Sequence, residues 1–186
     1  YAVKTYVDAL QNAVNAYVDA HLTPAYYESY GIGSTLQGPM LAKDQAVFFK
    51  FTATATGIFD EFILRQGDQP NSGSVSLQVA IFSAATNSLL PGSSVINITG
   101  GTGDYAKYMS SGLNASLVKN TDYYFVIRYT GTYVYWYSCY SQSFLSGTHG
   151  GRFCYEKTGV SDLNAYSTSF KDSDGFYNKP WFRISQ

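Results

Sequence analysis

The sequence predicts a mainly β protein in which an N-terminal helix precedes an antiparallel β-sandwich. Apolar residues recur at heptad spacing over the first 22 residues, and the hydrophobic period changes to two after residue 40. From there to the C-terminus, short strand-like segments recur about every ten residues, separated by turn residues and not by helical crossovers. We therefore divide the chain into a helix at 1–23, a linker at 24–39 and a β head domain at 40–186.

The first 23 residues have the pattern of a coiled-coil helix. Apolar or aromatic side chains lie alternately four and three positions apart, which is a heptad spacing and not the 3.6-residue period of an ordinary amphipathic helix. We refer to these positions as the heptad seam: Val3, Val7, Leu10, Val14, Tyr17 and His21. The pattern ends at Thr23-Pro24, because proline lacks the amide hydrogen that a continuing helix needs.

The heptad seam needs a partner, because an isolated helix of this length is marginal in water. One interpretation is that the helix lies on its own domain. The interpretation that we favour is a parallel coiled coil between copies of the chain. Valine and leucine in the seam are compatible with a dimer, whereas Tyr17 and His21 need more room or a hydrated centre, so the pattern leaves the number of subunits open.

The strands expected in the head follow from runs of β-branched and aromatic residues. Between 75 and 81, apolar residues alternate strictly with Ser, Gln and Ala, which is typical of a half-buried strand. Segments rich in Gly, Pro, Asn and Ser separate the runs. The expected strands are 46–52, 57–65, 75–81, 95–99, 104–110, 123–130, 133–142, 152–157 and 181–185. No internal repeat is detectable, which argues against propellers and solenoids.

Composition excludes several classes of partner. Twelve Lys and Arg against thirteen Asp and Glu leave a net charge of −1, so there is no basic surface for nucleic acid. No apolar run approaches the roughly 18 residues of a membrane span, so we expect no membrane insertion. Because the chain starts at Tyr1 without a Met or a signal-peptide pattern, we expect it to be part of a longer protein.

The search for catalytic and metal-binding motifs is negative. The chain has no G-x-S-x-G, Walker A, H-E-x-x-H or dinucleotide-binding motif, and its acidic residues are scattered. His149, one of two histidines, lies in a glycine-flanked stretch that we expect to be an exposed loop. Asp172 to Gly175 resembles the start of a calcium loop, but Arg183 stands where the bidentate acid is needed. We therefore expect no enzymatic activity, no metal and no cofactor.

The two cysteines, Cys139 and Cys154, allow one disulfide that closes a short loop, or two free thiols. Their spacing does not decide between these possibilities. Without a C-x-x-C motif, and with two histidines in the chain, neither a zinc site nor a redox motif is expected.

Tyrosine-rich segments are the most unusual feature of the head. The segments 123–129 and 133–140 are separated by Thr130-Gly131-Thr132, where we expect a tight hairpin. Strand alternation places Tyr133, Tyr135 and Tyr137 on one face, with Val and Trp on the face that suits a core.

The tyrosine row has two interpretations. The rings either recognise a polyhydroxy ligand or a protein, or they cover the outer sheet in cross-strand pairs with Tyr124 or Tyr129 and contact other subunits. The residues predicted to contact a ligand are Tyr133, Tyr135, Tyr137, Tyr140, His149, Arg152, Asp172 and Asp174.

A heptad helix that leads into a Tyr-, Ser-, Thr- and Gly-rich β domain resembles the distal end of phage tail fibres and receptor-binding proteins. The segment VKTYVDA at 3–9, with its echo AYVDA at 16–20, looks like the repetitive helical necks of such fibres. The amphipathic segment at 58–65, the run from Leu117 to Val126, Trp136 and Phe182 occur in an order that is similar to jelly-roll domains of tail and bacterial surface proteins.

The resemblance implies a jelly-roll-like head on a parallel homotrimeric neck, located on a virion tail fibre or another extracellular surface. It also implies that the head attaches to a host-surface glycan or protein. Three linked weak sites would then bind with avidity. Two alternatives stay open, namely a structural spacer or knob without a ligand of its own, and a polysaccharide-degrading enzyme domain.

Overall fold

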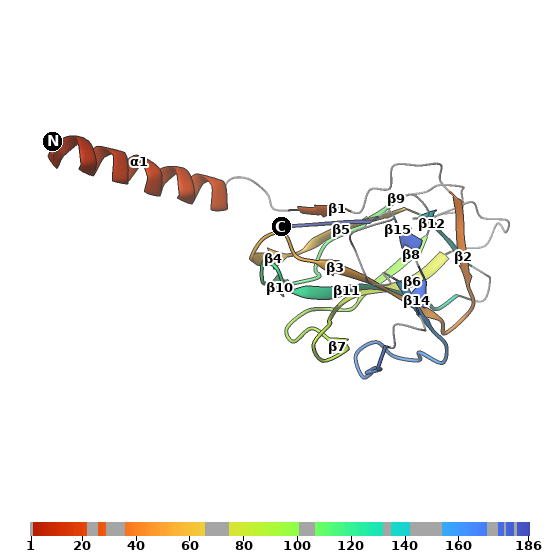
Figure 1. Cartoon of the computed structure of the whole chain (residues 1–186). Coiled ribbons are helices and arrows are strands. Elements are labelled where there is room, and N and C mark those ends of the chain that lie inside the picture. The colour runs from red at the N-terminus through yellow and green to blue at the C-terminus, as the bar shows by residue number, and fades with distance from the viewer. Residues whose placement is uncertain are drawn as a thin grey trace.

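The computed structural model confirms a mainly β chain with an N-terminal helix and antiparallel sheets (Figure 1). It describes residues 2–21, 26–28, 36–65, 75–100, 107–131, 135–141, 154–170, 175–176, 178–180 and 182–186. The helix extends away from the strands, which are gathered into one head.

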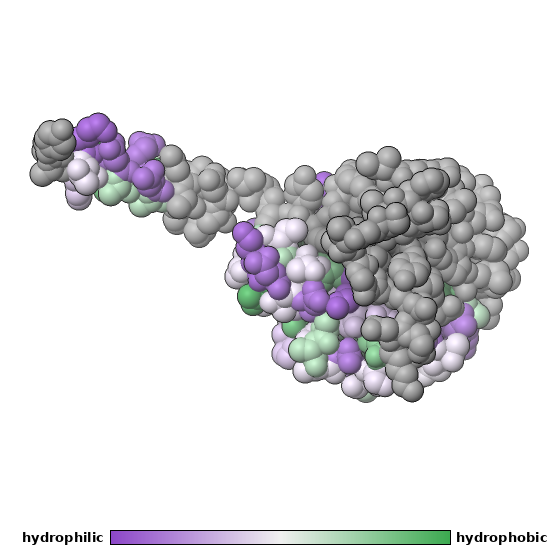
Figure 2. All heavy atoms as spheres, viewed as in Figure 1, coloured by the Kyte–Doolittle hydropathy of each residue, from purple (hydrophilic) through white to green (hydrophobic). Residues whose placement is uncertain are grey.

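Helix α1 (Ala2–His21) does not lie on the head over the part whose side chains are described. All residues from 4 to 14 are exposed, and Figure 2 shows this part of the helix standing clear of the head. The seam residues Val7, Leu10 and Val14 are 55%, 54% and 49% exposed. Lys4 and Asp8 form an ion pair of 2.7 Å one helical turn apart, outside the seam.

The largest described sheet has seven antiparallel strands, and its centre is β3, β11 and β6. Residue Phe125 of β11 pairs with Phe49 on one side and with Ile81 on the other. The strands are, in spatial order, β14 (Gly175–Phe176), β13 (Cys154–Lys157), β3 (Ala46–Thr52), β11 (Asp122–Tyr129), β6 (Val75–Ser83) and β7 (Ser88–Leu89), with β8 (Ile96–Gly100) also paired to β6.

Three smaller sheets complete the described part of the head. A four-stranded sheet has the order β1 (Tyr26–Glu28), β16 (Phe182–Ser185), β5 (Glu61–Arg65) and β9 (Lys107–Ser110). A three-stranded sheet has the order β15 (Asn178–Pro180), β12 (Tyr135–Ser141) and β2 (Leu36–Leu41). A two-stranded ribbon joins β10 (Ala115–Leu117) to β4 (Gly57–Phe59).

Two apolar clusters lie on opposite faces of the seven-stranded sheet, because successive side chains of a strand point to opposite faces. In the larger cluster, Phe125 of this sheet stacks on Phe182 of the four-stranded sheet, with ring centroids 4.2 Å apart. In the smaller cluster, Phe48 contacts Tyr166 and Phe170, which belong to the segment 158–170. The central strands are therefore buried on both sides, which explains their nearly continuous apolar sequences.

The hairpin expected at 130–132 is wrong, because β11 already has a partner along each edge. It pairs with β3 and β6, whereas β12 pairs with β2 and β15. Thr130 stays with the seven-stranded sheet by donating its backbone N–H to the Ser76 carbonyl at 2.9 Å. Gly131 is required by close packing, since a Cβ there would lie 2.5 Å from the hydroxyl of the buried Tyr129.

The idea that Tyr124 and Tyr129 belong to an exposed outer surface is also wrong. They are 5% and 1% exposed. Tyr124 faces the smaller cluster, where its ring lies 4.7 Å from that of Phe170. The segment 158–170 covers this face of the sheet, and that cover is not visible in the sequence of β11 itself.

Two further expectations differ from the structure in detail. The expected strand 57–65 is divided at Asp60 into β4 and β5, which belong to different sheets. The backbone N–H of Asp60 donates to the Ser185 carbonyl, and its carbonyl accepts from the N–H of Leu113, each at 3.0 Å. These two hydrogen bonds fix the backbone between β4 and β5. The segment 24–39, expected to be a linker, contains β1 and most of β2.

Candidate functional site

The side chains of the residues expected to contact a ligand lie outside the part of the chain that the structure describes. Tyr135, Tyr137 and Tyr140 lie on β12, of which the backbone alone is described. The others lie outside the described residues: Tyr133, His149, Arg152, Asp172 and Asp174. Their role as a binding surface stays a prediction.

The side chains of the two cysteines and of the residues at the ends of the heptad seam also lie outside the described part. Cys139 lies on β12 and Cys154 on β13, which belong to different sheets. Their side chains are outside the described part, so their pairing stays open. Val3, Tyr17 and His21 lie on α1, with their side chains also outside it.

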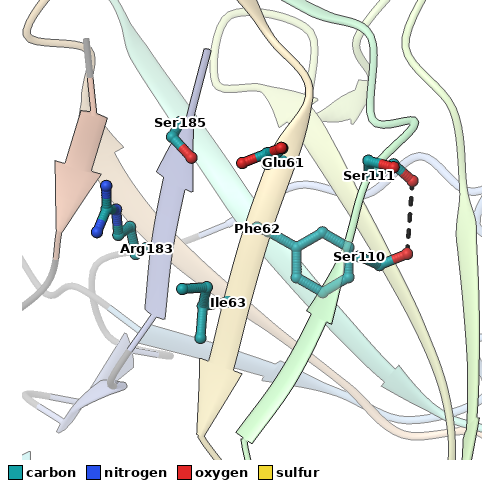
Figure 3. Close-up of a pocket in the computed structure, with 7 residues that line it drawn as sticks. All are labelled: Glu61, Phe62, Ile63, Ser110, Ser111, Arg183 and Ser185. Carbon is teal, nitrogen blue, oxygen red and sulfur yellow. Dashed lines mark hydrogen bonds between the residues drawn. The ribbon is translucent and has the colours of Figure 1, made fainter. Parts of the chain in front are cut away.

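A pocket that the sequence analysis missed lies on the four-stranded sheet (Figure 3). Its volume is about 380 Å³, at the lower end of the ~300–1,000 Å³ that is common for small-molecule sites. Three neighbouring strands or their ends line it: Glu61, Phe62, Ile63, Ser110, Ser111, Arg183 and Ser185.

Backbone pairing sets the arrangement of the polar groups in this pocket. Ser185 pairs with Glu61, and Arg183 pairs with Ile63, so all four side chains leave the same face of the sheet. Figure 3 shows Glu61 and Ser185 next to each other, whereas Arg183, two residues before Ser185 on β16, extends toward β1 on the other side of β16 from Glu61. A carboxylate, a guanidinium and a hydroxyl therefore share one surface.

The end of β9 supplies two more hydroxyl groups. Ser110 pairs with Phe62 of β5, and its hydroxyl donates to the Ser111 carbonyl at 3.4 Å. Ser111 is exposed and Ser110 is half-buried. The pocket thus has serine hydroxyls on both sides of β5.

The larger apolar cluster supports the pocket from behind. Phe62 is 1% exposed, and its ring lies 6.1 Å from that of Phe125 in an edge-to-face arrangement. Phe182 and Ile184 alternate with Arg183 and Ser185 and are buried in the same cluster. Because these apolar side chains fill the inner face, the polar residues of β16 are held on the outer face.

A second polar cluster, around Arg128 of β11, joins strands and loops of the head. Arg128 is 7% exposed. Its guanidinium donates to Asp44 Oδ1 at 2.6 Å, to Gln78 Oε1 at 2.7 Å and to the Val160 carbonyl. Asp44 has a φ of 62° and accepts at its carbonyl from the Val160 N–H at 2.9 Å. Because these donors serve protein acceptors, we assign the cluster a structural role.

Replacing Arg128 with Met is expected to lower the free energy of unfolding by about 2–3 kcal/mol, because buried hydrogen bonds to charged groups are lost. Urea unfolding at a fixed chain concentration measures the change. The control is Lys119→Met at an exposed position, where we expect a change within about 0.5 kcal/mol. Equal midpoints for the two variants would contradict the structural role.

Two carboxylates have pKa values below the ordinary value of 3.8 for aspartate. Partial burial raises the pKa of Asp122, but hydrogen bonds from Thr52 and Lys50, and the charge of Lys50, outweigh it. Hydrogen bonds from the backbone and side chain of Asn164 lower the pKa of Asp162. A general acid needs the opposite shift, so neither residue is a candidate for that role.

The lowered pKa of Asp122 predicts a defined pH dependence. Its ionised form accepts from Thr52 at 2.6 Å and pairs with Lys50 at 2.9 Å, so it stabilises the fold above the unfolded-state pKa. This stabilisation is lost as the pH falls through the lower folded-state pKa. The difference in unfolding free energy between wild type and Asp122→Asn should therefore be constant above about pH 5 and shrink below about pH 4. Equal differences at pH 7 and pH 3 in urea unfolding would contradict it.

Within the described residues, no three His, Cys, Asp or Glu side chains lie close enough together to hold a metal ion. The described helix is too polar to be a membrane span. No protein-family model matches the chain, and a search of curated proteins finds no match.

Proposed function

We propose that this chain is an attachment module of a virion tail fibre or another extracellular surface. Its helix assembles with copies of itself into a parallel homotrimeric neck, and its head, a jelly-roll-like sandwich, binds a host-surface glycan or protein. The observation that carries this proposal is the exposed heptad seam on a helix that points away from its own head.

The exposed seam is a large apolar surface for a helix in water. Val7, Leu10 and Val14 are each about half exposed, and Tyr6 beside them is 70% exposed. Each such side chain gains ~1.5–3 kcal/mol when it is fully buried. Their spacing places them on one side of α1, where a second and a third copy of the helix bury them together. The Lys4–Asp8 pair lies outside the seam and stays solvated in that arrangement.

Assembly at the neck explains how a head with modest affinity serves attachment. A parallel coil holds the heads at one end of the neck, so that several sites face the same surface and bind with avidity. The low content of charged residues, 13%, together with 18 Tyr, favours a neutral ligand bound by hydrogen bonds and ring contacts.

Light scattering of the full chain tests the assembly, and a glycan array with a host-surface binding assay tests the attachment. We expect three times the chain mass of 20.5 kDa and binding to at least one surface component. A monomer at every concentration contradicts the proposal. A trimer that binds nothing supports the spacer alternative, and release of fragments from a surface polysaccharide supports the enzyme alternative.

A further inference from the structure

We propose that the pocket on the four-stranded sheet binds adjacent hydroxyl groups of a neutral sugar. Glu61 is the acceptor for these hydroxyls, and Arg183 with the serine hydroxyls completes the hydrogen bonds. This inference rests on the attachment function proposed above and names the ligand class of one site on the head.

The charges of the pocket favour a neutral ligand. The lining holds one carboxylate, Glu61, and one guanidinium, Arg183, and the partner position of Arg183 on β1 is a second carboxylate residue, Glu28, so the site has no excess positive charge for an anionic ligand. An anionic ligand would meet Glu61, and a cationic ligand would meet Arg183. Sugar hydroxyls both donate and accept, so they match an acceptor-only carboxylate, a donor-only guanidinium and the hydroxyls of Ser111 and Ser185.

The spacing of the groups suits a pair of adjacent hydroxyls. Glu61 and Ser185 are direct cross-strand neighbours, so their Cβ atoms lie roughly 4.5–5.5 Å apart, and diagonal neighbours such as Glu61 and Arg183 lie at about 7–8 Å. The two oxygens of one carboxylate can accept from two hydroxyls on neighbouring carbons. Ile63, which pairs with Arg183, adds apolar surface for the C–H side of a sugar ring.

The pocket is built on paired strands, so its residues lose little conformational entropy when a ligand binds. Strand β16 pairs with β5 on one side and with β1 on the other. Strand β1 places Tyr26 opposite Ser185 and Glu28 opposite Arg183, so a tyrosine and a second carboxylate residue stand in register with the pocket. Sites carried by strands are held more precisely than sites carried by loops.

The test is a titration of the full chain with a neutral glycan selected on an array that also holds acidic glycans. We expect Glu61→Gln to weaken binding about ten- to hundredfold, because a hydrogen bond to a charged group is lost. Ser111→Ala, at an exposed position, should weaken it several-fold. Glu61 is itself exposed, so the variant should fold, and circular dichroism checks this.

Asp162→Asn is the matched control, since it makes the same chemical change at an exposed site. Asp162 belongs to the segment that covers the other face of the seven-stranded sheet, away from the pocket. We expect wild-type affinity from this variant.

Three outcomes distinguish a failure of the pocket proposal from a failure of the proposed attachment function. Unchanged affinity of Glu61→Gln overturns the pocket as the site and leaves attachment in place. Binding to acidic glycans alone, or to a host protein alone, overturns the ligand class and leaves attachment in place. A chain that binds no surface component overturns both.

Discussion

Replacing Leu10 with Asp should convert the proposed homotrimer into monomers. Leu10 is 54% exposed in the single chain and lies between Val7 and Val14 on the seam. In a parallel coil the same position of every copy meets at the axis, so each subunit loses an apolar contact and adds a carboxylate beside identical carboxylates. We expect the apparent dissociation constant to rise by at least about a hundredfold. Light scattering over a concentration series measures it.

Asn12→Asp is the control for this variant. Asn12 is also exposed on α1, but it lies between seam positions on the opposite side of the helix. It introduces the same side chain at a place that a coil leaves in solvent, so the assembly should persist. Equal masses for the two variants would mean that the seam is not the contact.

Replacing Phe125 with Ala should lower the free energy of unfolding by about 3–5 kcal/mol, the range for a large aromatic side chain removed from a core. Phe125 has no exposed surface, and it joins the two largest sheets by stacking on Phe182 and meeting Phe62 edge to face. The total stability of a domain is about 5–15 kcal/mol. Urea unfolding at fixed chain concentration measures the loss, which is a large share of that total.

Ile58→Ala is the comparison for the core variant. Ile58 lies on β4 and is 62% exposed. Removing its side chain leaves no cavity, so we expect a change within about 0.5 kcal/mol. If Phe125→Ala were as mild as Ile58→Ala, the two sheets would not share the core described above.

The central strands and their inward faces were predictable from the sequence, whereas β1, β2 and the short strands β7, β10, β14 and β15 were not expected. In β5, Phe62 and Leu64 alternate with Glu61 and Ile63, and the period of two identifies which pair is buried. The same alternation in β16 places Arg183 and Ser185 on the face opposite Phe182 and Ile184, where Arg183 is half-buried and Ser185 is buried. What could not be predicted is that β5 and β16 are neighbours, because they are far apart in the chain and no local pattern specifies that pairing.

Two errors have the same physical origin. A Thr-Gly-Thr sequence at 130–132 is suitable for a hairpin, but a turn forms one only if the preceding strand has a free edge, and β11 has none. The burial of Tyr124 depends on the segment 158–170, which packs on its strand from a distant part of the sequence. Local chemistry describes what a segment is able to form, and long-range packing decides which option is used.

The pairing of β1 with β16 has a mechanical consequence for an attachment module. Strand β1 follows α1 in the chain, so tension applied along the neck reaches the head at β1. Its hydrogen bonds to β16 run across the strand direction, and a pull along the strand loads them together instead of opening them one by one. Since β16 lies between β1 and β5, and Glu61 lies on β5, force between a ligand in the proposed site and the neck crosses two strand pairs, β5–β16 and β16–β1.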